Sequence, residues 1–142
     1  MRRSLVLDTV LDPVFRVAFV FSLFLLFAGH NAPGGGFVGG LVASAALVLR
    51  YVAGGVPEVR RVAPWPAEVV LGVGLVTAVT TGVGGWVWGT EFLESVEVEA
   101  AVPVLGTVKA TSALSFDVGV YVVVVGMTLA ILTAFGRREE DA

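Results

Sequence analysis

The sequence predicts an all-α integral membrane protein with four transmembrane helices in a single membrane domain, residues 1–142. Hydrophobic residues make up 56% of the chain and charged residues only 15%, whereas a soluble domain carries roughly a quarter charged residues. Four stretches approach or reach the about 20 apolar residues that a helix needs to cross lipid hydrocarbon. They are residues 14–29, 36–56, 67–89 and 113–135. Helices are expected despite the many valines, because an open structure satisfies its backbone in lipid only as a helix.

Composition excludes several other classes of protein. The absence of cysteine excludes a disulfide scaffold, an iron–sulfur cluster and a thiolate zinc site. Nine basic residues against twelve acidic ones do not make the basic footprint of a nucleic-acid-binding protein. A single histidine is too little for a zinc site, and no pattern of nucleophile, histidine and carboxylate supports catalysis. We therefore expect a protein that is not an enzyme and holds no metal or cofactor.

The charged residues near the first two spans predict where the first helix begins and which side chains form ion pairs. Only Val17 to Gly29 is free of charge in the first span, so residues 5–12 are expected to extend that helix among the lipid headgroups. Asp12 lies four residues before Arg16, a spacing that favours a pair on one helix face. Arg50, near the end of the second span, is expected either to reach the membrane surface or to pair with a neighbouring subunit. Prolines after the second span are expected to stop it and to start the third.

The basic residues predict that both termini are cytoplasmic. Eight of the nine lie toward one side of the predicted bundle, and only Lys109 lies on the other. Cytoplasmic segments carry the excess of Lys and Arg, and four spans require both termini on the same side. The external connection at residues 90–112 alternates valine with glutamate at 96–99 and holds Gly106, which is typical of a small β-hairpin. Its acidic residues predict either a mouth that attracts cations or an ordinary solvated loop.

A glycine-rich segment, residues 29–41, is the most distinctive stretch. It formally contains a G-x-G-x-x-G dinucleotide pattern, but that motif needs a preceding strand and here an apolar helix precedes it. Small residues instead recur at every fourth position, which lets another backbone approach closely. The three series are Gly36, Gly40, Ser44; Gly35, Gly39, Ala43; and, in the third span, Gly74, Ala78, Gly82.

Residues 30–37, His-Asn-Ala-Pro-Gly-Gly-Gly-Phe, resemble the signature of the B subunit of multisubunit sodium/proton antiporters of the Mrp or Mnh type. Residues 105–109 and 116–121 resemble two later motifs of that family, and the resemblance covers nearly the whole chain in the same order. A related domain ends the large A subunit in many family members, and a chain of this length fits the separate B subunit better. The motif and packing residues are Asn31, Pro33, Gly34, Gly35, Gly36, Phe37, Gly39 and Gly40.

The resemblance implies an integral subunit of a cation antiporter complex in the cytoplasmic membrane of a prokaryote. Such complexes exchange cytoplasmic sodium for external protons. The implied partners are the large A and D type subunits, to which the proton channels are mainly attributed, and small membrane subunits. No catalytic centre is established for the B subunit of this family.

Asp117 and His30 are the candidate residues of an ion path or of a polar patch at the external end. Asp117 is the only acid well inside a predicted span. It lies four residues beyond Ala113, where the fourth predicted span begins, which is about 6 Å deep at the helical rise of 1.5 Å per residue. His30 titrates near neutral pH and lies on the same side. The alternatives are an aspartate at the membrane interface and a histidine with a structural role in its loop.

Two other functions stay open beside the accessory subunit. One is a self-contained four-helix transporter that works as a homodimer, and the other is a scaffold or assembly subunit that conducts nothing. The homodimer needs a buried acid near mid-membrane. Val17 to Gly29 has none, and Asp117 is shallow.

The predicted topology is tested by cysteine labelling. Single cysteines next to Arg61 and Glu97 should react with a membrane-impermeant reagent from opposite sides, because the third span separates them. Labelling of both positions from the same side would contradict the topology.

Overall fold

A computed structural model describes residues 5–29, 34–87, 97–102 and 106–141. In these residues the elements are α1 Leu5–Ala28, α2 Gly36–Val62, α3 Ala67–Val87, β1 Glu97–Val102, β2 Gly106–Thr111 and α4 Ser112–Asp141. Each of the four described helices contains a stretch long and apolar enough to cross a membrane. The predicted class, an all-α membrane protein with four transmembrane helices, is confirmed.

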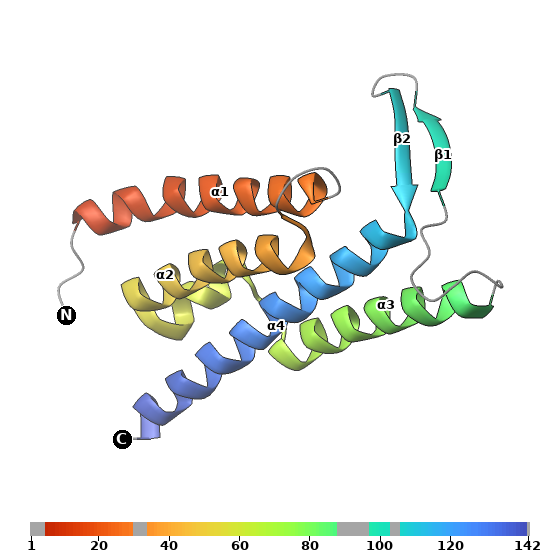
Figure 1. The fold of residues 1–142 in the computed structure, drawn as a ribbon. Helices are drawn as coiled ribbons and strands as arrows, with labels where there is room; N and C mark the ends of the chain where they lie inside the picture. The colour runs from red at the N-terminus through yellow and green to blue at the C-terminus, as the bar shows by residue number, and fades with distance from the viewer. Residues whose placement is uncertain (1–4, 30–33, 88–96, 103–105, 142) are drawn as a thin grey trace.

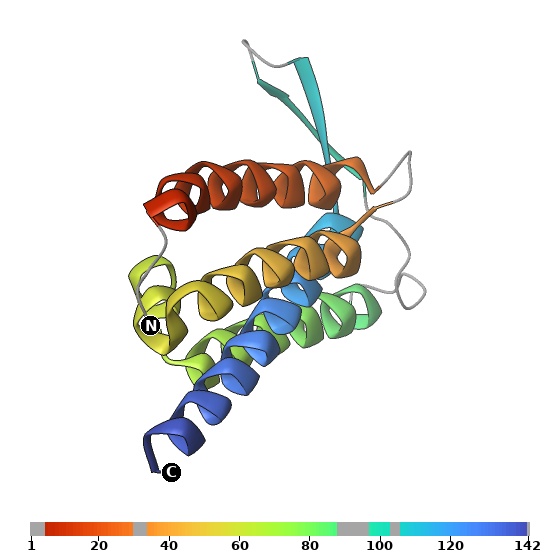
Figure 2. The same ribbon diagram turned by 90° about the vertical axis from the view of Figure 1, so that its left-hand side faces the viewer.

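The helices pack in the spatial order α1, α2, α4, α3, so that α4 lies between α2 and α3 (Figure 1, Figure 2). α1 packs mainly on α2 and touches α4 over a shorter stretch. The start of α1, the turn between α2 and α3, and the end of α4 lie at the same end of the bundle. We call it the arginine end, after Arg50, Arg60, Arg61, Arg137 and Arg138.

β1 and β2 form an antiparallel hairpin in which Glu97 is opposite Thr111 and Val102 is opposite Gly106. The hairpin stands out from the bundle at the end opposite the arginine end (Figure 1). β2 leads directly into α4 at Ser112. The start of α4 is therefore joined to a two-stranded unit rather than to a long irregular connection.

Two helices are longer than the apolar pattern that predicts them. α1 begins at Leu5, so residues 5–12 extend the first helix ahead of its apolar stretch as predicted, and Pro13 lies inside it. α4 continues to Asp141, past the predicted end at residue 135. Hydropathy marks the part of a helix that suits hydrocarbon, whereas helical hydrogen bonding continues where charged side chains reach the headgroups.

α2 is broken at Gly54 and Gly55, close to the predicted end of the second span. Gly55 has φ 70° and ψ −160°, and Gly54 is also outside helical geometry. Glycine adopts a positive φ at no steric cost, which permits the sharp turn here. Pro57 then lies in the first turn of a short helical piece, residues 56–62, where its missing N–H breaks no helical hydrogen bond. We call residues 56–62 the return segment.

Small residues bring α2 into close contact with α4. A Cβ on Gly36 would collide with the carbonyl oxygen of Asp117, and one on Gly40 would lie 2.9 Å from Cβ of Val124. One turn further, Thr128 donates a hydrogen bond to the hydroxyl of Ser44 at 2.9 Å. These separations leave no room for a side chain, so glycine sets the distance between the two helices.

Close contacts at glycines also join α4 to α3 and α2 to α1. A Cβ on Gly119 of α4 would lie 2.7 Å from the backbone nitrogen of Ala78, and one on Gly74 of α3 would lie 2.6 Å from that of Val123. On the other side of α2, a Cβ on Gly39 would lie 2.7 Å from the carbonyl oxygen of Ser22. The fully buried Ser22 is in turn hydrogen-bonded to the Tyr121 hydroxyl at 2.9 Å, which ties α1 to α4.

Alanine substitutions should have opposite effects at tight and open glycines. Gly36→Ala and Gly40→Ala should each lower the free energy of unfolding by about 1–3 kcal/mol, because the added methyl group forces the helices apart. Gly72→Ala is the matched control, since nothing among the described residues outside its own helix lies within 4 Å of its Cβ position. It should stabilise the helix by up to about 1 kcal/mol. Thermal unfolding in detergent measures both, and equal effects at all three sites would contradict this packing.

Candidate functional site

The glycine-rich motif forms the tight start of α2. Gly35 has φ 103° and donates its backbone N–H to the carbonyl oxygen of Leu25 in α1 at 2.9 Å. A Cβ on Gly34 would lie 2.7 Å from the same oxygen. A side chain would be strained at Gly35 and crowded at Gly34, so the glycines allow the chain to start α2 directly against α1.

Asp117 lies beside this start of α2. Its Oδ2 atom is 3.5 Å and its Oδ1 atom 3.8 Å from the position that a Cβ on Gly35 would occupy. The carboxyl group is partly buried and faces the N-terminal end of α2. The aligned peptide dipoles make this end electropositive, which favours a carboxylate. Three elements, α1, α2 and α4, therefore meet where the motif residues and Asp117 come together.

The other motif residues lie in different places. His30, Asn31 and Pro33 fall outside the described residues, so the proximity of His30 to Asp117 stays a prediction. Phe37 is 58% exposed, on the surface of the bundle. Gly39 and Gly40 are buried, Gly39 against α1 and Gly40 against α4.

A buried charge cluster, which sequence reasoning missed, lies at the arginine end. The guanidinium of Arg50 donates to Oδ1 of Asp12 at 2.5 Å and to Oε2 of Glu58 at 3.4 Å. The side chains of Arg50 and Glu58 are only 7% and 5% exposed, whereas that of Asp12 is 57% exposed. Arg61 pairs with the other oxygen of Glu58 at 3.1 Å.

Arg50 is the centre of this cluster. Its Cζ atom lies 4.9 Å from the centroid of the Phe15 ring, which adds a cation–π contact from α1. Its Nε atom is buried and has no hydrogen-bond partner among the described residues. Arg50 thus connects α1, α2 and the return segment through one planar group with several donors.

These contacts correct two expectations. Asp12 pairs with Arg50 of α2, rather than with Arg16 one turn along its own helix. Arg50 pairs inside its own chain, rather than reaching the surface or awaiting another subunit. The available signal was a charged residue inside an apolar span, followed by Gly-Gly and Pro and then an acid at position 58. That combination lets the chain turn back on itself.

Within the described residues, the charged side chains lie toward the ends of the apolar stretches, and several hydroxyl groups between them bond to other helices or to their own backbone. Within the described residues, no group of three or more His, Asp or Glu side chains is placed to hold a metal ion. Four apolar helices with charged groups at both ends define a multi-pass membrane protein.

The chain belongs to the family described as "Domain related to MnhB subunit of Na+/H+ antiporter", whose model matches residues 6–130. The resemblance read from the sequence is thereby confirmed. This is a family of transporter subunits rather than of classical enzymes.

Two curated relatives match almost end to end. The chain is 43% identical over 136 residues to the B subunit of the Na(+)/H(+) antiporter of Bacillus subtilis, covering 96% of this chain and 95% of the relative. It is 38% identical over 136 residues to the protein of the same name from Alkalihalophilus pseudofirmus, covering 94% of that protein. With four helices that can cross a membrane and bacterial relatives of this kind, the protein is a multi-pass protein of the prokaryotic cell membrane.

A solved structure shares the fold. A chain in the structure of the Mrp complex from Dietzia sp. DQ12-45-1b matches with a TM-score of 0.77 and 34% sequence identity. The match covers 92% of the present chain but spans only 14% of that chain. The same four-helix unit therefore also occurs as a small part of a much longer polypeptide.

The buried Arg50 should be essential to the stability of the protein, whereas the exposed Arg61 of the same cluster should not. Arg50→Met should lower the free energy of unfolding by about 3 kcal/mol, because it leaves the carboxylate of Glu58 buried with one partner fewer. Arg61→Gln, at a side chain 72% exposed, should cost less than about 1 kcal/mol. Adding Glu58→Gln to Arg50→Met should recover much of the loss. Thermal unfolding in detergent measures all three, and equal losses for both arginines would refute a central role of Arg50.

Proposed function

We propose that this protein is the B-type subunit of a multisubunit Na+/H+ antiporter in the cell membrane. In this role it packs against larger antiporter subunits and supports Na+ efflux coupled to H+ influx. The observation that carries the proposal is the 43% identity to the B subunit of an Na(+)/H(+) antiporter over 95% of that protein. A match of this extent aligns nearly the whole of both sequences, so the relative is similar in all of its spans and not in one segment alone.

The distribution of charge favours an accessory subunit over a self-contained transporter. No charged residue occurs within Val17–Ala28, Gly36–Leu49, Val69–Val87 or Val118–Gly136. The bundle is instead closed by close glycine contacts and by the Ser22–Tyr121 and Ser44–Thr128 hydrogen bonds. A cation or proton crossing this subunit alone would meet no acidic side chain and no Lys, Arg or His within these stretches, which is unfavourable in a medium of low dielectric. We infer that the ions cross elsewhere in the complex.

The exposed apolar surface supports assembly with partners. α1 presents Phe21, Phe24 and Phe27 at 51–63% exposure, and α3 presents a row of exposed valines. In a membrane such faces contact either lipid or other helices. The implied partners are the large A and D type subunits and the small membrane subunits, and the protein itself is proposed to catalyse no covalent reaction.

Asp117, together with His30, is proposed to form a polar patch at the end of the bundle opposite the arginine end. The carboxyl group of Asp117 lies beside the start of α2, the end of the helix that its aligned peptide dipoles make electropositive. The glycines that allow this contact are those of the family motif. The motif residues are therefore proposed to act together, with Gly34, Gly35 and Gly36 positioning α2 and Asn31 and Pro33 shaping the connection before it.

Replacing Asp117 tests whether its charge is used. Asp117→Asn keeps size and hydrogen bonding while it removes the charge. Sodium-dependent antiport in membrane vesicles should fall about tenfold or more, while co-purification with the other subunits stays normal. Ser115→Ala, at an exposed position two residues earlier on α4, is the control and should leave both unchanged.

The outcomes separate the possible roles. Loss of antiport and assembly together would make Asp117 structural, and no change in either would make it an ordinary interfacial residue. His30→Gln should have a smaller effect, because an amide reproduces the hydrogen bonding of neutral imidazole. Failure of the chain to co-purify with any other membrane subunit would refute the proposed function itself.

A further inference from the structure

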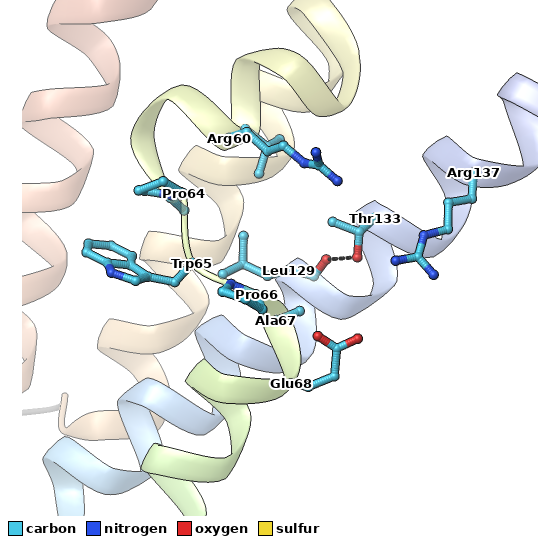
Figure 3. A pocket seen from close by; sticks show the side chains of 11 residues that line it. Arg60, Pro64, Trp65, Pro66, Ala67, Glu68, Leu129, Thr133 and Arg137 are labelled. Atoms are coloured by element: carbon cyan, nitrogen blue, oxygen red, sulfur yellow. Dashed lines mark hydrogen bonds between the residues drawn. The ribbon is translucent and has the colours of Figure 1, made fainter.

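A pocket of about 280 Å³ opens at the arginine end, between the return segment, the start of α3 and the end of α4. Its charged and polar side chains are Arg60, Glu68, Thr133 and Arg137 (Figure 3). A second hollow of about 250 Å³ shares Arg60, Thr133 and Arg137 with it. Both spaces are far larger than the about 30 Å³ that one water molecule occupies in the liquid.

The two arginines of the pocket are available to a ligand. Among the described residues, neither Arg60 nor Arg137 forms an ion pair, whereas the neighbouring Arg61 is paired with Glu58. The guanidinium groups of Arg60 and Arg137 approach the same space from α2 and from α4 (Figure 3). Two guanidinium groups that face one space bind phosphate oxygens well, because each offers a planar set of N–H donors.

The same pocket also offers acceptors. The carboxyl group of Glu68 turns toward the space below the two arginines (Figure 3). The hydroxyl of Thr133 donates to the carbonyl oxygen of Leu129 at 2.8 Å, so its oxygen is left to accept a hydrogen bond. A ligand that carries both a phosphate and an ammonium group satisfies the donors and the acceptors at once.

The location of the pocket is that of the lipid headgroups. The apolar span of α2 ends at Val62, that of α3 starts at Ala67, and that of α4 ends at Arg138. Trp65, in the turn between α2 and α3, is 64% exposed, and tryptophan is enriched at the membrane–water interface. Basic pockets between transmembrane helices at this level bind phospholipid headgroups.

We propose that this pocket binds the headgroup of an aminophospholipid such as phosphatidylethanolamine. The phosphate lies between Arg60 and Arg137, and the ammonium group lies on Glu68 and Thr133. The bound lipid fastens the return segment to the ends of α3 and α4.

Lipid titration of the full-length chain in detergent, read out by native mass spectrometry, tests the proposal. The wild-type chain should bind phosphatidylethanolamine more tightly than phosphatidylglycerol, which has the phosphate but no ammonium group. Arg60→Gln with Arg137→Gln should weaken binding of both lipids about tenfold. Arg61→Gln with Arg138→Gln is the matched control, because it removes the same charge from adjacent positions that line neither hollow. It should leave binding unchanged.

Two further arms identify the ligand. Glu68→Gln should abolish the preference for phosphatidylethanolamine while it leaves binding of phosphatidylglycerol intact. Inorganic phosphate at millimolar concentration should not displace the lipid. Equal losses for the two arginine pairs would reduce the effect to general electrostatic attraction, and displacement by phosphate would make this a site for the free anion. Either result overturns the proposal, as does an unchanged lipid preference in Glu68→Gln, which also decides the matter if the arginine double variant does not fold.

Discussion

The close approach of α2 to α4 is the constraint on which the rest of the structure depends. Helices in lipid gain no hydrophobic energy from meeting each other, so close packing and hydrogen bonds between helices must hold them together. Gly36 and Gly40 provide the close packing, and the Ser44–Thr128 pair provides the hydrogen bond. α4 is also packed tightly on α3 through Gly119 and Gly126. It therefore fixes the position of α3 relative to α2, and through α2 relative to α1.

The two ends of the bundle use this packing differently. At the end that carries the hairpin, the glycines bring the start of α2 against the backbone of Asp117 and place a carboxyl group beside a helix N-terminus. At the arginine end, the glycines at positions 54 and 55 break α2 and allow the return segment to bring Glu58 back to Arg50. One end thus holds a partly exposed carboxyl group, and the other holds a charge cluster that is largely satisfied within the chain.

The layer between these ends explains why this chain suits a partner role. It is closed by small residues, leucines and paired hydroxyl groups, and no Asp, Glu, His, Lys or Arg occurs within residues 17–28, 36–49, 69–87 or 118–136. A tightly packed apolar layer is stiff, so displacement of a helix at one end would move the other end as well. Under the proposed function, such a unit braces larger subunits, and the proposed polar patch faces them while the ions cross elsewhere in the complex.

The sequence by itself determined the class of protein, the approximate spans and the family. The length and apolar content of a segment can be read from that segment alone, and an apolar segment of this length in lipid satisfies its backbone only as a helix. The spacing of four residues between Gly36, Gly40 and Ser44 also predicted a close helix contact, because that spacing places small residues on one helix face. The sequence did not identify the partner of that face, since the pattern describes one surface and not the surface that meets it. Only the tertiary structure decided that α4 fills this place and that Arg50 pairs with Asp12 and Glu58. The Gly-Gly and Pro after Arg50 permit a turn, but the local sequence does not specify which helix lies alongside, so the pairing of Arg50 with Asp12 of α1 could not be read from it.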